Sequence, residues 1–160
     1  MSTVYMGCED TVIAHSTHDL GLHSYPNYTH NEVNSWCAVD LGTGRRLKPT
    51  QYCIRHGTSS GGNALRSWEL RAREKDTDKW DTLKVHDNDG ELSDAPLSVA
   101  LWDIEPTLAR AADNGHSIIN EKGYRYFLLL QTNVNSSGNN CLFIGGLEFY
   151  GILTEKIQSL

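Results

Sequence analysis

The sequence predicts an all-β protein, an antiparallel jelly-roll β-sandwich with about eight strands. Two observations lead to this prediction. Runs of aromatic, β-branched and aliphatic residues alternate with Gly, Pro, Asn and Asp turn signals at short intervals along the 160 residues. Only residues 105–116 have the composition of one or two helical turns, with Pro106 near their start and Asn114-Gly115 as a stop signal.

Each strand is placed by a local pattern. Residues 4–6 and 12–14 are short apolar runs, which we expect at sheet edges. Residues 52–56 alternate as a strand with two different faces should. Residues 124–130 are too apolar to be one-sided, so we expect a central strand that is covered on both faces. The other expected strands cover residues 36–41, 68–74, 80–86, 99–104 and 141–153.

Composition bounds the class of protein. A chain of this length with 39% hydrophobic and 21% charged residues is typical of one globular domain, which we place at residues 1–153 with a frayed tail at 154–160. A formal net charge of −6 argues against nucleic acid as a partner. No run approaches the ~20 apolar residues that span a bilayer, and no secretion signal is visible.

Aromatic and sulfur-containing residues supply part of the expected core. We expect Trp36, Trp68, Trp80 and Trp102 to be buried, since aromatic residues dominate burial in such sandwiches. The cysteines show no CxxC spacing, and three of them lie in apolar, strand-like settings where a free cysteine acts as a small hydrophobe. Reduced thiols and an intracellular, cytoplasmic location are the expectation. The four cysteines are Cys8, Cys37, Cys53 and Cys141.

Three stretches carry a resemblance to a known superfamily. They read WCAVDLGTGRRLKPTQYCIRHGTSSGGNALRSW (residues 36–68), WELRAREKDTDKWDTL (68–83) and YRYFLLLQTNVNSSGNNCLFIGGLEFYG (124–151). Residues 30–153 thereby resemble the discoidin, or F5/8 type C, galactose-binding-like superfamily. The resemblance is closest to the intracellular branch found in HECT-type ubiquitin ligases and BTB-domain proteins. It implies a jelly roll whose end loops bind sugars, lipid headgroups or peptides. The disulfide that usually ties the ends of secreted members has no evident counterpart here.

Three polar loops are expected to meet at one end of the sandwich: residues 17–31, 56–66 and 132–140. Their aromatic rings can stack on a ligand, while Asn and Arg supply directional hydrogen bonds. The alternative is that these Asn-, Ser- and Gly-rich loops satisfy their own backbone, and that His56 only fixes its loop. The predicted ligand-binding residues are His23, Tyr25, Tyr28, His30, His56, Ser59, Asn63, Arg66 and Asn135.

Neither a metal site nor a catalytic site is expected. Four histidines lie close together in sequence, with Cys8 and Asp19 nearby, but their spacing matches no zinc site. Residues 57–61 read GTSSG and have the G-x-S-x-G spacing, but beside His56 they form a Gly/Ser loop pattern with no evident activating group. The chain has no HExxH or P-loop motif, so we predict no enzymatic activity and no cofactor. The histidines concerned are His15, His18, His23 and His30.

Three functions remain open at this point. The first is a recognition module that binds a protein or peptide partner through the end loops, within an intracellular ubiquitin-ligase-type assembly. The second is a carbohydrate-binding, lectin-like module that uses the same loops, and the third is a structural subunit of a larger complex. A lectin should have a concave pocket with an exposed ring beside Arg or Asn, whereas a structural subunit should have an apolar patch on a sheet face. Membrane binding is not expected.

Overall fold

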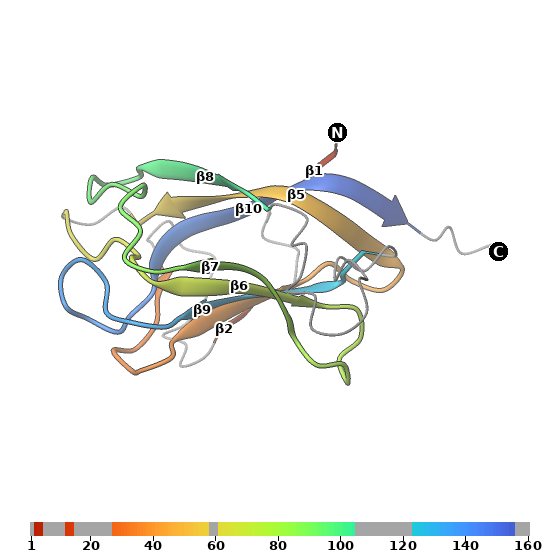
Figure 1. Cartoon of the computed structure of the whole chain (residues 1–160), viewed down its shortest axis with the longest axis horizontal. Coiled ribbons are helices and arrows are strands. Elements are labelled where there is room, and N and C mark those ends of the chain that lie inside the picture. Colours follow the sequence, from red (N-terminus) through yellow and green to blue (C-terminus); the bar gives the residue numbers. More distant parts are fainter. Residues whose placement is uncertain (1, 5–11, 15–26, 58–60, 105–122, 156–160) are drawn as a thin grey trace, which may run out of the picture.

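A computed structural model of the chain describes residues 2–4, 12–14, 27–57, 61–104 and 123–155 (Figure 1). These residues form two sheets packed face to face, one in the order β1-β10-β5-β8 with β3 also paired to β10, the other in the order β2-β4-β9-β6-β7. The strands are β1 Ser2–Val4, β2 Val12–Ala14, β3 Asn27–Tyr28, β4 Trp36–Asp40, β5 Arg45–His56, β6 Trp68–Arg73, β7 Asp81–His86, β8 Val99–Asp103, β9 Tyr126–Gln131 and β10 Phe143–Glu155. The predicted all-β jelly-roll sandwich is confirmed.

The order of strands follows the local sequence patterns. The run at 12–14 forms β2, whereas β1 lies at Ser2–Val4 and shares only Val4 with the run expected at 4–6. Both strands lie at the edge of their sheets, and the most apolar run forms β9 at the centre. β10 continues to Glu155, which pairs with Arg45 of β5, so this strand runs two residues past the predicted boundary at 153. The predicted helical turns at 105–116 and residues 156–160 lie outside the described part of the chain.

The core lies between the sheets and is built from alternate positions of their strands. β6 shows this most clearly, because Trp68, Leu70 and Ala72 are buried while the residues between them are partly exposed. Tyr52 and Ile54 of β5 face them from the opposite sheet and are also fully buried. Burying each large apolar side chain contributes about 1.5–3 kcal/mol relative to exposure, which makes this layer the main source of stability.

The tryptophans divide into two pairs. Trp68 and Trp102 are buried in the core, as predicted. The prediction was wrong for Trp36 and Trp80, which are half-buried. Alternation along β4 directs its second and fourth residues inward and leaves Trp36 on the outer face. Trp80 lies before β7, where the guanidinium carbon of Arg73 is 4.3 Å from the centroid of its ring in a cation–π contact.

The described cysteines behave as apolar residues. Cys37 and Cys53 are buried, Cys141 is half-buried, and all three are free thiols; Cys8 lies outside the described residues. Burial raises the pKa of Cys37 to about 12, which keeps this thiol protonated at neutral pH. A separate finding is that no helix in the described part of the chain is long and apolar enough to span a membrane.

Candidate functional site

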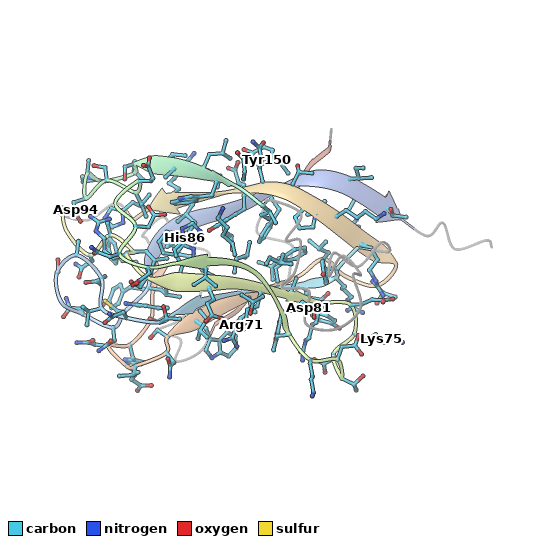
Figure 2. The ribbon with its side chains drawn as sticks, in the orientation of Figure 1. Arg71, Lys75, Asp81, His86, Asp94 and Tyr150 are labelled. Carbon is cyan, nitrogen blue, oxygen red and sulfur yellow. The ribbon has the colours of Figure 1, made fainter. Side chains whose placement is uncertain are left out.

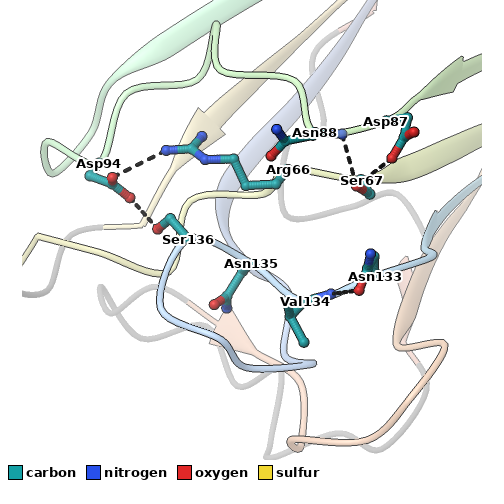
Figure 3. Close-up of a pocket in the computed structure, with 9 residues that line it drawn as sticks. All are labelled: Arg66, Ser67, Asp87, Asn88, Asp94, Asn133, Val134, Asn135 and Ser136. Carbon is teal, nitrogen blue, oxygen red and sulfur yellow. Dashed lines mark hydrogen bonds and ion pairs between the residues drawn. The ribbon is translucent and has the colours of Figure 1, made fainter.

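A polar pocket of about 510 Å³ opens at one end of the sandwich (Figure 3). Three loops form it: the β5–β6, β7–β8 and β9–β10 connections. Of the nine residues that line it, eight are polar or charged and one, Val134, is apolar. Such a lining suits a ligand rich in hydrogen-bonding groups. The lining residues are Arg66, Ser67, Asp87, Asn88, Asp94, Asn133, Val134, Asn135 and Ser136.

One ion pair joins the walls of this pocket. The Arg66 guanidinium donates to Asp94 at 3.1 Å and to the carbonyl oxygen of Leu92 at 2.6 Å. The other carboxylate oxygen of Asp94 accepts from the Ser136 hydroxyl and from the Ala64 amide, so the side chain of Asp94 connects all three loops. The Ser136 hydrogen bond is the main reason that the pKa of Asp94 is below its ordinary value. Asp94 is therefore a carboxylate at neutral pH.

Two other side chains in the pocket are exposed and available to a ligand. Asp87 accepts from the Ser67 hydroxyl at a long 3.5 Å, and among the described residues no cation pairs with its carboxylate. Asn88 has a left-handed backbone (φ 50°), which asparagine tolerates, and its side chain is exposed. Asp94 neutralises Arg66, so the carboxylate of Asp87 gives the lining an excess of one negative charge.

Asn135 holds the β9–β10 loop together from its interior. Its side chain is buried, and its oxygen accepts from the amides of Ser137 and Asn139, both at 3.0 Å. Its amide nitrogen donates to the side-chain oxygen of Asn63 and to the carbonyl oxygen of Cys141, both at 3.2 Å. All four hydrogen-bonding positions of this amide are used, and one of them fastens the loop to the β5–β6 connection.

Replacing Asn135 by alanine is expected to lower the free energy of unfolding by about 2–3 kcal/mol, because buried polar groups lose their partners. Asn140→Ala is the matched control. Asn140 bonds to Asn31 through its backbone amide, at 2.7 Å, and alanine keeps that amide. The control should change stability by less than about 0.5 kcal/mol. Urea unfolding of the three proteins measures both values, and equal losses in the two variants would contradict the assigned role of Asn135.

A buried polar cluster lies beneath the β7–β8 loop. Trp68 Nε1 donates to the Tyr52 hydroxyl oxygen at 2.9 Å, and that oxygen is 2.6 Å from His86 Nε2. His86 Nδ1 is 2.6 Å from Asp89 Oδ2, and Trp102 Nε1 donates to the same oxygen at 3.0 Å. Figure 2 shows His86 between the sheets, toward the end that carries Asp94. The chain from Asp89 through His86 ends at the fully buried Tyr52, so it cannot reach a substrate as a catalytic relay would.

Comparison with known proteins identifies the fold. No family model and no curated protein matches the sequence, but solved structures do match it. An F5/8 type C domain from Bacteroides fragilis is 14% identical, with a TM-score of 0.60 and coverage of 93% of each chain. This chain has the F5/8 type C fold.

Two binding modules share this fold with the chain. The CpGH89CBM32-5 module of Clostridium perfringens, solved with GalNAc-β-1,3-galactose, is 12% identical with a TM-score of 0.59, covering 89% of this chain and 95% of the module. Chitosan-binding module 1 from a Paenibacillus sp. IK-5 chitosanase/glucanase is 13% identical with a TM-score of 0.55, also covering 89% and 95%. These matches agree with the predicted superfamily at the level of fold, and they give no support to its intracellular branch.

Within this F5/8 type C fold, some of the predicted site residues lie at the pocket and others do not. Arg66 and Asn135 line the pocket, and Asn63 lies beside it through its bond to Asn135. His56 is fully buried, with Nδ1 3.1 Å from the Phe143 carbonyl oxygen and Nε2 2.9 Å from the Gly62 carbonyl oxygen. Its ring therefore has no surface left for a ligand. The structure favours the alternative in which His56 fixes its loop.

The first predicted loop is described only from residue 27 onward. Tyr28 is half exposed in β3, where it pairs with Phe143, and His30 is exposed. Neither residue lines the pocket. His23, Tyr25 and Ser59 lie outside the described residues, as do three of the four clustered histidines. Among the described residues, no group of three His, Cys, Asp or Glu side chains could hold a metal ion.

Sequence reasoning missed the contribution of the β7–β8 loop. Asp87 and Asn88 belong to a segment that reads Asp-Asn-Asp-Gly, which predicts a turn and says nothing of a ligand. Their position follows from topology, because β7 and β9 both run toward the same end of the sheet. The loops after these two strands therefore meet there. The order of the strands in the sheet was therefore the feature from which the position of the β7–β8 loop could have been inferred.

Proposed function

We propose that this chain is a non-catalytic carbohydrate-binding module whose ligand occupies the loop-end pocket. The observation that carries this proposal is the lining itself: a concave site in which Arg66, Asp87 and Asn88 offer charged and amide groups to a polyhydroxylated ligand. Modules of the same fold that were solved with or named for a saccharide support it.

The charge of the pocket narrows the class of saccharide. Arg66 is paired with Asp94, and Asp87 has no cationic partner among the described residues, so the pocket carries excess negative charge. A carboxylated or sulfated sugar would meet like charge here, whereas hydroxyl or ammonium groups would find acceptors. Neutral and amino sugars are therefore the proposed ligands.

The apolar contact in this pocket is small. None of the nine lining residues is aromatic, and Val134, 39% exposed, provides the apolar surface against which a sugar ring could rest. The exposed ring expected of a lectin is thus missing from this lining. Without ring stacking, a single site should bind weakly, so the measurement needs oligosaccharides at millimolar concentration.

The test compares four oligosaccharides by calorimetry at pH 7: a glucosamine oligomer, its N-acetylated counterpart, a galactose-terminated oligomer and a galacturonate oligomer. At least one of the first three should bind, and the galacturonate oligomer should bind least. Arg66→Ala should weaken binding at least about tenfold, since it removes a donor and releases Asp94. Arg71→Ala is the matched control, because Arg71 pairs with Glu69 on β6 outside the pocket.

The outcomes distinguish the location of the sugar site, the charge argument and the function itself. Binding that Arg66→Ala weakens and Arg71→Ala leaves intact supports the proposed site. Preferential binding of galacturonate would overturn the charge argument but keep the function. Binding that neither variant changes would move the sugar site elsewhere on the chain, and no binding of any oligosaccharide by the folded wild-type protein would contradict the function.

A structural subunit that contacts a protein through a sheet face, the third function left open by the sequence, is the second candidate, and one surface favours it. Leu97, Val99 and Leu101 are each at least half exposed, and the last two lie on one face of β8, which ends the strand order of its sheet. An apolar row on such a strand suits a protein contact. Capture of one specific protein that Leu101→Lys abolishes and Arg66→Ala leaves unchanged would favour this candidate. The intracellular location and the ubiquitin-ligase assembly remain predictions from the sequence.

A further inference from the structure

The β7–β8 loop supplies three of the pocket residues and rests on the buried cluster. Its first residue, Asp87, directly follows His86, the last residue of β7, and Asp89 comes two residues later. The backbone amide of Asp89 also donates to the Arg66 carbonyl oxygen at 2.7 Å. His86 and Asp89 thus flank the pocket residues Asp87 and Asn88 in the chain, so a movement of either one would displace the pocket wall.

The hydrogen bonds of the cluster determine the protonation state of His86. An indole nitrogen can only donate, so Trp68 uses the Tyr52 hydroxyl as an acceptor. The hydroxyl proton of Tyr52 is then directed to the second neighbour of that oxygen, His86 Nε2. Asp89 accepts from His86 Nδ1 on the other side. The arrangement is complete when Nδ1 carries a proton and Nε2 does not, which is a neutral imidazole.

A second proton on His86 disrupts this arrangement. With Nε2 protonated, the Tyr52 oxygen would face two donors, Trp68 and His86, and its own hydrogen would point into the core. Tyr52 is fully buried, so that hydrogen would find no water as a replacement acceptor. The imidazolium form is therefore incompatible with the packed cluster.

The surroundings of the His86 ring also favour its neutral form. Burial is the main reason that the pKa of His86 is below its ordinary value, and the charge of Lys84 lowers it further. The hydrogen bond to Asp89 and the charge of that carboxylate raise it, without reversing the shift. The groups that contact the ring are Tyr52 of β5, Asp89 and the indole rings of Trp68 and Trp102, and the charge of Lys84 of β7 also acts on it.

We propose that the pocket is gated by pH: it keeps its shape while His86 is neutral and opens when acid protonates this ring and separates it from Tyr52. The sign follows from proton linkage. The arrangement described above, in which His86 contacts Tyr52, is the closed form, and it disfavours a second proton on His86. In an open form, where the ring has left Tyr52 and has an ordinary imidazole pKa, His86 binds that proton more tightly. Acid therefore favours the open form progressively as the pH falls below about 6.5. A sugar held in the closed pocket would be released on acidification, a consequence that rests on the function proposed above.

The gate is tested in the wild-type protein without ligand, so it can fail independently of the sugar-binding proposal. Long-range ¹H–¹⁵N spectra recorded from pH 8 to pH 4 report both ring nitrogens of His86. We expect a neutral ring with its proton on Nδ1, a titration midpoint below about 6.5, and amide shifts of residues 87–94 with the same midpoint. A midpoint at or above 6.5, or loop amides that do not follow it, would overturn the gate.

A pair of matched variants tests the role of the Tyr52 hydroxyl. Tyr52→Phe removes the donor that stabilises the neutral ring, so the midpoint of His86 should rise by about half to one pH unit. Tyr150→Phe removes a hydroxyl that donates to Glu148 on β10, and it should leave the midpoint unchanged. An unchanged midpoint in Tyr52→Phe would mean that burial and the charge of Lys84 lower the pKa of His86 without help from the hydroxyl, which overturns the hydrogen-bond mechanism. Should Tyr52→Phe fail to fold, the wild-type titration still decides the proposal.

Discussion

Replacing Asp89 by alanine is expected to lower the free energy of unfolding by about 3–5 kcal/mol. This carboxylate accepts from Trp102 Nε1 at 3.0 Å, from the Glu91 amide at 2.8 Å and from the imidazole of His86. These bonds hold its pKa below the ordinary value despite its partial burial. Truncation removes the shared acceptor and leaves the indole and imidazole donors, both in buried residues, without a partner.

The neighbouring Asp87 provides a matched control for this experiment. It is exposed, and its contact with Ser67 is long, so Asp87→Ala should change stability by less than about 0.5 kcal/mol. Guanidinium unfolding of the two variants beside the wild type gives the comparison. A loss below about 1 kcal/mol in Asp89→Ala would show that the buried cluster is not a stabilising element, and it would weaken the argument for the pH gate as well.

Replacing Gly151 by alanine is expected to lower the free energy of unfolding by about 3 kcal/mol, at the upper end of the cost of overpacking. A Cβ atom at this position would lie 2.0 Å from the Lys48 carbonyl oxygen and 2.9 Å from the Cα atom of Pro49. Both are backbone atoms of the paired strand β5, so no side-chain rotation relieves the overlap. The register of β5 and β10 is irregular at this point, between Tyr150 and Gly151, and the two backbones approach closely there.

Gly90→Ala is the control for that substitution. A Cβ at Gly90 would have no heavy atom within 4 Å, so this change should alter stability by less than about 0.5 kcal/mol. Thermal unfolding of both variants checks the difference. If Gly151→Ala is as stable as the wild type, the strands can separate at the irregularity without cost, contrary to the packing described here.

Much of the fold could be predicted because strand patterns are local. The alternation in β6 and the continuous apolar run of β9 each depend on neighbouring residues, and they located these strands to within two residues. The alternation at residues 52–56 found only the second part of β5, which begins at Arg45. The same logic does not say which tryptophan faces inward. Trp36 begins β4 on its outer face, and that depends on the register with β9.

The candidate site was less predictable, because its contacts join distant positions. Arg66 was selected as a charged residue in a polar loop, but its partner Asp94 lies 28 positions away. Asn135 was selected as a ligand-binding residue, and it does line the pocket, yet its four hydrogen bonds give it a structural role as well. Residue type alone cannot separate a side chain that meets a ligand from one that supports the loop.

By itself, the sequence determined the β class, the position of most strands and the polar character of the loops, since all three follow from residue type and short-range periodicity. The tertiary structure decided which loops share a pocket and how Tyr52, His86 and Asp89 come together. Tyr52 and His86 are 34 positions apart and belong to opposite sheets. Their hydrogen bond exists because the two sheets pack face to face, and no local pattern encodes that packing.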